Sequence, residues 1–286
     1  DEIEGVEDHV IRTTKIISNT EISDIISDEG FNPNEINKII LGNHKLDSLV
    51  SGDLDGDRLD YLVRDAHYTG VSTGVDMGRL IATMSLQNSS LVVKEKGLPA
   101  VEALLTARST MYQTVYFHSF ARGAQLMLAR AATSAISSGD FSINDFVTFT
   151  DHKFLSELNK SGGLSRGLCN DFENRKIVKR AVSITKEQME LSGLEKSKKK
   201  DYEDSIASKL GIDSSKIYVD IPKFSVMPGL KTKILKNDGT ISLAHNESKL
   251  VSGLYEAQFD HWRGSVYGPS ELRDEILSIS KTVLGV

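Results

Sequence analysis

The sequence predicts a mainly helical domain over residues 1–160, followed by a small α+β domain over residues 161–286. Apolar residues recur at helical spacing through most of the first part, and the stretch 99–137 has no proline after its first residue. Beyond a glycine-containing loop at 161–163, short β-rich stretches alternate with helical ones. This order of elements is typical of a helical domain joined to an α+β domain.

The elements of the helical domain follow from its apolar spacing and its breaks. Short helices open the chain, and the breaks lie at Asn19-Thr20 and before Pro33. The stretch that begins at Pro99 is either one long helix or two helices that break near Gly123, its single glycine. In chain order, helices are predicted at 6–18, 21–28, 33–42, 54–66, 75–84 and 99–137, with a short strand at 90–94.

The α+β domain is predicted from β-branched runs and turn residues. Asn237-Asp238-Gly239 is a favourable turn for a hairpin between strands at 231–235 and 241–243. Further strands are predicted at 178–184, 217–221 and 265–267, and helices at 198–210, 246–260 and 270–284.

The composition limits which partners the protein can bind and in which compartment it can be located. The net charge of -6 gives no general electrostatic footprint for nucleic acid, so a local group of Lys and Arg must hold any anionic ligand. No apolar run approaches the ~20 residues that span a bilayer, and the first residues are acidic where a signal peptide is basic and then apolar. The single cysteine, Cys169, excludes an internal disulfide and suits a reducing compartment. We therefore expect a cytoplasmic protein without a membrane partner.

An aspartate-rich stretch at 51–65 is the most informative part of the chain. If it is helical, Asp57, Tyr61 and Asp65 share one face at i, i+4 and i+8, and Asp60 and Arg64 pair beside them. Two carboxylates and a phenol in line suit a ligand with a metal-bound phosphate at one end and a sugar hydroxyl at the other.

Composition alone favours a simpler interpretation, in which this stretch is an exposed acidic helix with i, i+4 ion pairs. An EF-hand is excluded. Asp53, Asp55 and Asp57 match its first three ligands, but the loop lacks glycine at its sixth position and glutamate at its twelfth.

The segment SGDLDGDRLDYLVRDAHYTGV at 51–71 matches the pattern S-G-x-L-D-A-D-R-x-D-Y-L-x-R-D-x-x-x-T-G of HD-domain phosphohydrolases. The similarity extends to 74–81, 93–97, 107–112 and 115–118, and the order of segments continues into the C-terminal domain. The chain thus resembles this family, and most of all its deoxynucleoside triphosphate triphosphohydrolases. The resemblance implies an HD-type helical bundle, followed by the α+β domain, and hydrolysis of deoxynucleoside triphosphates to deoxynucleoside and triphosphate.

Carried over by position, the resemblance makes Asp57 the last protein ligand of a divalent metal, without distinguishing Mg, Mn, Fe, Zn and Ni. It places Tyr61 and Asp65 beside the deoxyribose. It also implies that Arg64 contacts phosphate and that His67 lies near the phosphates, although a lone histidine in a loop is more often structural or exposed.

The resemblance also gives roles to the helix that starts near Pro99. Arg108 matches a phosphate-binding arginine, and Tyr116 matches a tyrosine that packs against the sugar and disfavours a 2′-hydroxyl. Arg108, Tyr112 and Tyr116 lie at i, i+4 and i+8, so one helical stripe presents a guanidinium and two rings to a nucleotide. The alternative is an ordinary amphipathic stripe with half-buried tyrosines.

Near the front, the segment 8–17 is weakly similar to the family's H-E-x-x-S/T-x-x-I-I. This similarity places His9 at the catalytic histidine, a general acid for the leaving oxygen. The glutamate that follows this histidine in the family is Val10 here. The ring therefore lacks the neighbouring carboxylate that would orient it and raise its pKa.

The family's metal site needs one histidine and then an adjacent His-Asp pair before the His9 segment, and no such pair precedes Asp57. One carboxylate does not hold a catalytic cation against water. Either roughly a hundred residues, about one small domain, are absent from this chain, or the protein is a natural degenerate form. The survival of the other motif residues favours absence. The alternative function is a catalytically incomplete nucleotide- or nucleic-acid-binding protein.

Three cations match positions that bind an activating nucleotide between subunits of the family: Arg79, Lys94 and Lys96. The resemblance therefore implies a homo-oligomer, a dimer or tetramer, with an allosteric nucleotide site. The alternative is that these are ordinary solubilising surface cations.

Overall fold

The computed structural model describes residues 3, 5–88, 90–222 and 232–286. The chain divides into two compact units. Unit 1 comprises Asp1–Val6, Tyr116–Phe224 and Asp260–Val286, and unit 2 comprises Glu7–Val115 and Ser225–Phe259. These units divide the chain elsewhere than at residue 160, because the later segment of unit 2 packs with the front of the chain. The division into two functional domains at residue 160 therefore stays a prediction.

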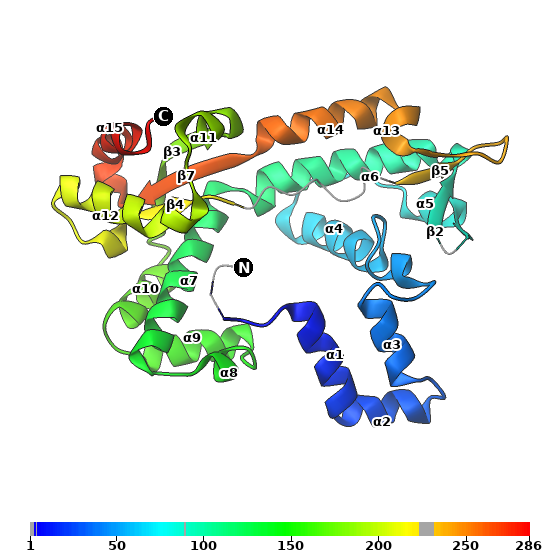
Figure 1. Cartoon of the computed structure of the whole chain (residues 1–286), viewed down its shortest axis with the longest axis horizontal. Helices are drawn as coiled ribbons and strands as arrows, with labels where there is room; N and C mark the ends of the chain where they lie inside the picture. Colours follow the sequence, from blue (N-terminus) through cyan, green and yellow to red (C-terminus); the bar gives the residue numbers. More distant parts are fainter. Residues whose placement is uncertain (1–2, 4, 89, 223–231) are drawn as a thin grey trace. The chain divides into compact units, whose positions relative to one another are not determined.

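Unit 2 is mainly helical, and several of its helices begin at residues whose side chains cap them. The Asp8 carboxylate accepts from the Val10 N–H at the start of the first helix, and Pro33 occupies the first turn of the third. Figure 1 shows α4 alongside α6. The helices of unit 2 are α1 (His9–Asn19), α2 (Glu21–Asp28), α3 (Pro33–Ile40), α4 (Gly56–Thr69), α5 (Met77–Thr83), α6 (Leu98–Met111), α13 (Ala244–Glu247) and α14 (Lys249–His261), with 3-10 turns at Asp47–Leu49 and Glu95–Gly97.

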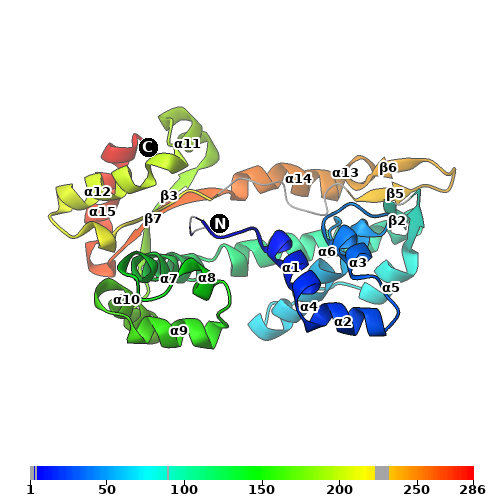
Figure 2. The same cartoon turned by 60° about the horizontal axis from the view of Figure 1, so that its bottom comes forward.

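A four-stranded sheet of order β1-β2-β5-β6 joins distant parts of the chain within unit 2. β2 (Ser90–Lys94) pairs in parallel with β5 (Lys233–Leu235) and antiparallel with β1 (Met84–Gln87). β5 and β6 (Ile241–Leu243) form the predicted hairpin, in which Gly239 adopts φ 84°. Figure 2 shows this hairpin next to β2. The predicted strand at 231–235 begins at a residue outside the described ranges.

The stretch from 99 to 137 is two helices, but the predicted break near Gly123 is wrong. α6 ends at Met111, a π-helix spans Tyr112–Tyr116, and α7 (Ser119–Ser138) runs through Gly123 without interruption. Gly123 is buried, and a Cβ there would lie 2.9 Å from the Val178 carbonyl oxygen. This glycine therefore allows close packing of α7 and does not end the helix.

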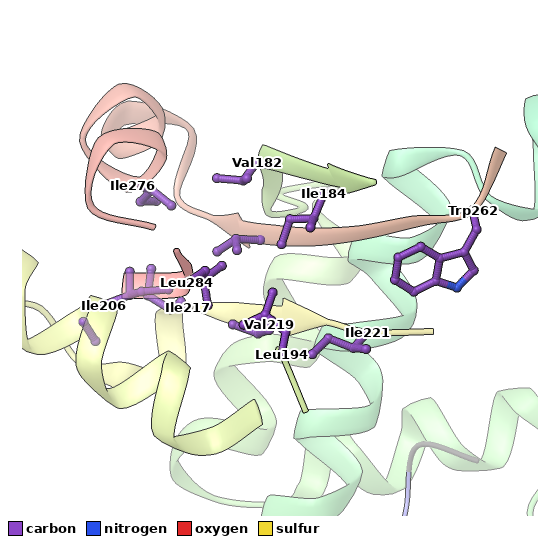
Figure 3. Packing of buried hydrophobic residues seen from close by; sticks show 12 residues of the cluster. Val182, Ile184, Leu194, Ile206, Ile217, Val219, Ile221, Trp262, Ile276 and Leu284 are labelled. Atoms are coloured by element: carbon purple, nitrogen blue, oxygen red, sulfur yellow. The ribbon is translucent and has the colours of Figure 1, made fainter. Parts of the chain in front are cut away.

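Unit 1 packs helices around a three-stranded antiparallel sheet of order β3-β7-β4. Its larger apolar core lies between this sheet and the helices α12 and α15, and it includes Trp262. Figure 3 shows side chains of β3, β4, α12 and α15 in this core. After α7, the elements of unit 1 are α8 (Ile143–Phe146), α9 (Asp151–Lys160), α10 (Gly163–Glu173), β3 (Lys179–Thr185), α11 (Lys186–Ser192), α12 (Lys199–Leu210), β4 (Tyr218–Asp220), β7 (Arg263–Gly268) and α15 (Arg273–Leu284), with 3-10 turns at Lys196–Lys198, Ser214–Lys216 and Ser270–Leu272.

The architecture confirms the predicted fold class, an HD-type helical part with a smaller α+β part. The predicted strands and the larger predicted helices are present, with ends that differ by a few residues. Helices α8, α9 and α10 and strand β1 were not predicted. Among the described residues, no helix has the length and apolar character needed to cross a membrane.

Candidate functional site

Helix α4 carries the aspartate-rich motif. Asp55 caps its start, since one carboxylate oxygen accepts from the Arg58 N–H at 2.7 Å, and Gly70 ends it in the left-handed conformation. Leu59 and Leu62 are buried and fix the side of the helix that faces the core of unit 2. The predicted helix over 54–66 is therefore present, and its face of acidic residues has a defined orientation.

The side chains of that face differ in exposure. Asp57 in the first turn is exposed, whereas Tyr61 and Asp65 are half-buried. Asp60 and Arg64 form the predicted i, i+4 ion pair, with 55% and 61% of their side chains exposed. The helix thus has an exposed ion pair, Asp60 and Arg64, beside the half-buried Tyr61 and Asp65. It is therefore neither a wholly exposed acidic helix nor a wholly buried ligand-binding face.

The most unusual group in unit 2 is Arg108, which is only 4% exposed. Its Nη2 donates to the Tyr112 hydroxyl at 3.1 Å, and its Cζ lies 5.2 Å from the centre of the Tyr112 ring. Its Nε is buried and has no hydrogen-bond partner among the described residues. A buried guanidinium with an unsatisfied donor is costly unless a ligand completes it.

Tyr61 of α4 interacts with Arg108 of α6 and with Tyr112, which follows the last residue of α6. Burial raises the pKa of Tyr61, the positive charge of Arg108 opposes that rise, and the charge of Tyr112 and a hydrogen bond with it add to it. The structure therefore brings Tyr61 to two predicted site residues, Arg108 and Tyr112, that are distant from it in sequence. In this group the Arg108 guanidinium lies beside the uncharged phenols of Tyr112 and Tyr61.

A small, partly open recess lies between the start of α4 and α6. Arg108 is at its α6 side, and Arg58 is at its α4 side. Arg58 is a residue that our sequence analysis did not select. Its Nη1 donates to the Gly52 carbonyl and to the Asp55 carboxylate, and this ion pair holds the loop that precedes α4. The recess is lined by Asp53, Leu54, Arg58, Leu59, Leu62, Leu104, Leu105 and Arg108.

The predicted stripe of Arg108, Tyr112 and Tyr116 is not a regular helical stripe. Tyr112 begins the π-helix and Tyr116 ends it, so the i, i+4 spacing of an α-helix does not continue between them. The boundary between the two units also falls immediately before Tyr116. Arg108 and Tyr112 are in contact, and the role of Tyr116 stays a prediction.

The two predicted histidines do not line the recess. His9 is the first residue of α1 and is exposed. His67 is exposed in the last turn of α4, where its ring lies edge-on to Tyr68 with 5.2 Å between ring centres. The structure gives neither histidine a contact with Arg108 or Tyr112, so their proposed roles rest on the resemblance alone.

Two of the three predicted allosteric cations are in contact. Arg79 of α5 donates from Nη2 to the Lys96 carbonyl oxygen at 3.1 Å. Lys94 ends β2 and, like Lys96, is exposed. Gly97 makes this approach possible, because a Cβ at that position would lie 2.2 Å from Thr83 Oγ1. The structure therefore brings Arg79 to the backbone of Lys96, and a common site for all three cations stays a prediction.

The described residues do not form a complete metal centre. No group of three or more His, Cys, Asp and Glu side chains among them is placed to hold a metal ion. Asp57 is the predicted ligand, and its exposed carboxylate alone does not fit such a centre.

A comparison with known families assigns the chain to one of them. Residues 75–286 match the family model described as the HD associated region, which is most of the chain. The chain belongs to the HD-associated region family. The aspartate-rich motif at 51–71 lies before the matched residues. The family is consistent with the HD-type resemblance of the sequence.

The curated relatives include longer proteins without an assigned activity. An uncharacterized protein of Methanocaldococcus jannaschii is 28% identical over 87% of this chain, and one of Bacillus subtilis is 28% identical over 90%. The chain covers 56% and 66% of these two proteins. A deoxynucleoside triphosphate triphosphohydrolase SAMHD1 homolog of Dictyostelium discoideum is 28% identical over 44% of this chain and 26% of its own length.

Solved structures support the same fold. A hypothetical protein of Aquifex aeolicus matches 97% of this chain and 72% of its own, with a TM-score of 0.73 and 27% identity. A phosphohydrolase of Bacteroides thetaiotaomicron matches 86% of this chain and 70% of its own, with a TM-score of 0.63 and 21% identity. The chain therefore shares its fold with both solved structures.

Proposed function

We propose that this chain supplies the substrate-binding part of a metal-dependent hydrolase that converts deoxynucleoside triphosphates to deoxynucleoside and triphosphate. The observation that carries the proposal is Arg108, a buried guanidinium without an ion-pair partner among the described residues. Such a group is stabilised by an anionic ligand oxygen. The Dictyostelium relative, named as a triphosphohydrolase of this substrate class, supports the choice of substrate.

Each residue has a defined task in this proposal. Arg108 offsets the negative charge on the phosphates, and Tyr61 and Asp65 bind the deoxyribose hydroxyl. His9 protonates the leaving sugar oxygen. Tyr116 packs against the sugar. Arg64 and His67 contact the phosphates from the exposed side of α4.

Asp57 is proposed as one ligand of a divalent metal, which supplies Lewis-acid activation of a water molecule when bound. The described residues hold no group of three or more His, Cys, Asp and Glu side chains that would complete its coordination. A cytoplasmic location is part of the same proposal.

The decisive experiment compares Asp57→Ala with Asp60→Ala in the protein expressed from its complete gene. Release of inorganic triphosphate from each deoxynucleoside triphosphate is measured with Mn²⁺ or Mg²⁺. We expect Asp57→Ala to abolish turnover and metal binding. Asp60→Ala should keep the metal, because Asp60 pairs with Arg64 on the exposed side of α4, and it should perturb only that ion pair or the orientation of Arg64.

Three results would contradict parts of this proposal. Equal loss of metal from both variants would contradict the assignment of helix faces. Absence of triphosphate release under all conditions would contradict the activity. Binding of dGTP in calorimetry without any turnover would instead support a nucleotide-binding protein that does no chemistry.

We further propose that Arg79, Lys94 and Lys96 bind an activating nucleotide and that the protein is a homodimer or homotetramer. The contact between Arg79 and the Lys96 backbone supports a common site. The double variant Arg79→Ala/Lys96→Ala is expected to lose activation by added nucleotide and to change the oligomeric state in light scattering. Unchanged activation and unchanged assembly would contradict this assignment.

A further inference from the structure

Arg108 is held from one side by a tyrosine that was expected to contact the nucleotide. The Tyr112 hydroxyl accepts from Arg108 Nη2 at 3.1 Å, and the ring lies within cation–π distance of the guanidinium, 5.2 Å from Cζ to ring centre. A hydrogen bond to the hydroxyl and a cation–π contact with the ring together restrict the long Arg108 side chain. Tyr112 is therefore placed to fix the direction of Arg108.

Tyr112 is in turn fixed from α4. Its hydroxyl is hydrogen bonded to that of Tyr61, which is itself half-buried. Because Tyr61 belongs to α4 and Tyr112 follows the last residue of α6, the bridge ties two helices that pack against each other. A guanidinium at the end of this bridge has its position set by both helices.

The neutrality of the two phenols matters for the arginine. A carboxylate at the position of Tyr112 would orient Arg108 equally well, but it would cancel the positive charge that an anionic ligand needs. A phenol accepts one N–H and leaves the net charge of the guanidinium intact. Among the described residues, Nε of Arg108 also has no partner, so this donor is not used within the fold.

We infer that Tyr112, supported by Tyr61, is a positioning residue that orients Arg108 for an anionic oxygen and does not itself contact the anion. This inference rests on the proposed function for the claim that Arg108 binds phosphate. It differs from the sequence-based expectation, in which the Tyr112 ring was part of the surface offered to the nucleotide.

The first test measures binding of inorganic triphosphate to the full chain by calorimetry. We expect Tyr112→Phe, which keeps the ring and loses the hydroxyl, to weaken binding by about fivefold to tenfold. Tyr61→Phe should weaken it less, because it acts through Tyr112. The matched control is Tyr68→Phe on the same helix as Tyr61, whose side chain is 81% exposed, and it should leave binding unchanged.

A double-mutant cycle separates positioning from direct contact. In an Arg108→Lys background the guanidinium is gone, so Tyr112→Phe should change triphosphate binding by less than about twofold. If Tyr112→Phe weakens binding by the same factor in both backgrounds, Tyr112 touches the anion itself and the inference is overturned.

A second measurement does not depend on the ligand. The Nε–H signal of Arg108 in ¹⁵N-resolved NMR reports how rigidly the guanidinium is held. Its exchange with solvent should be about fivefold faster in Tyr112→Phe than in the wild type, and unchanged in Tyr68→Phe. Failure of the wild type to bind triphosphate would overturn the proposed function alone, whereas equal exchange in wild type and Tyr112→Phe would overturn the positioning role.

Discussion

Two arginines, one in each unit, are withdrawn from solvent to different degrees and have different partners: Arg108 is buried and Arg130 is partly buried. Arg130 of α7 donates from Nη2 to the Glu203 carboxylate at 2.6 Å and from Nη1 to the Ser215 and Ile217 carbonyls at 2.7 Å. Its Cζ also lies 3.8 Å from the centre of the Tyr218 ring. Arg108 of α6 has a phenol and a ring but no carboxylate among the described residues.

The two arginines differ in whether a carboxylate of the fold compensates their charge. Arg130 has its charge compensated within unit 1, so its loss leaves Glu203 buried and uncompensated. Arg108 has no such partner, so its charge remains for a ligand. Both residues are arginines on helices, and Arg108 is the more buried of the two. The neighbouring carboxylate decides the difference.

The largest effect is expected from Arg130→Ala. It should lower the free energy of unfolding by about 3–5 kcal/mol, because the Glu203 carboxylate, only 3% exposed, loses its partner. Urea unfolding followed by the fluorescence of Trp262, which lies in the core of unit 1, measures this change. The control Arg130→Met/Glu203→Leu removes both charges and should cost less than the single substitution. A loss below about 1 kcal/mol in Arg130→Ala would remove the contrast between the two arginines.

The ring beside Arg130 gives a pH-dependent prediction. Burial raises the pKa of Tyr218 from 10.0 to about 12, against the lowering effect of Arg130, and the side chain is 1% exposed. Because the folded-state pKa is raised, the stabilisation is fully present below pH 10 and is lost as pH rises to about 12. The free energy of unfolding should fall by roughly 2–3 kcal/mol over this window.

Tyr218→Phe is the control for that titration and should lack this fall. The substitution itself should cost little at neutral pH, because the Tyr218 hydroxyl is buried without a hydrogen-bond partner among the described residues. Parallel pH dependence of unfolding in wild type and Tyr218→Phe would show that Tyr218 is not the group that titrates.

A smaller change in stability than that of Arg130→Ala, or a gain in stability, is expected from Arg108→Leu. Removing a buried cation that has no carboxylate partner leaves no uncompensated charge, so the free energy of unfolding should stay within about 1 kcal/mol or rise. Triphosphate binding should be lost in calorimetry. Destabilisation as large as that of Arg130→Ala would mean that Arg108 is also a structural arginine.

The smallest effect is expected at the surface of α4. Asp60→Ala breaks the ion pair with Arg64, in which both side chains are more than half exposed, and should change the free energy of unfolding by no more than about 0.5 kcal/mol. Thermal unfolding at low and high salt measures it. A larger, salt-independent loss would indicate that Asp60 has a partner beyond the exposed pair.

Particular elements show where sequence reasoning reached its limit. Apolar spacing and caps predicted α1, α2, α3 and α4, and the hairpin turn around Gly239, because these depend on neighbours within a few residues. Gly123 was misjudged, since its role is set by the Val178 carbonyl from a distant segment. The π-helix at Tyr112–Tyr116 carries no comparable local signal.

The sequence by itself determined the row of Asp57, Tyr61 and Asp65 on one helix, because helical geometry fixes which residues share a face. Only the tertiary structure decided that Tyr61 interacts with Tyr112 and Arg108, and that β5 pairs with β2. It also decided that Arg130 has a carboxylate partner, whereas Arg108 is held by a phenol. The physical reason is range. Backbone hydrogen bonding repeats every few residues, whereas the partner of a buried charge comes from whichever distant segment packs against it.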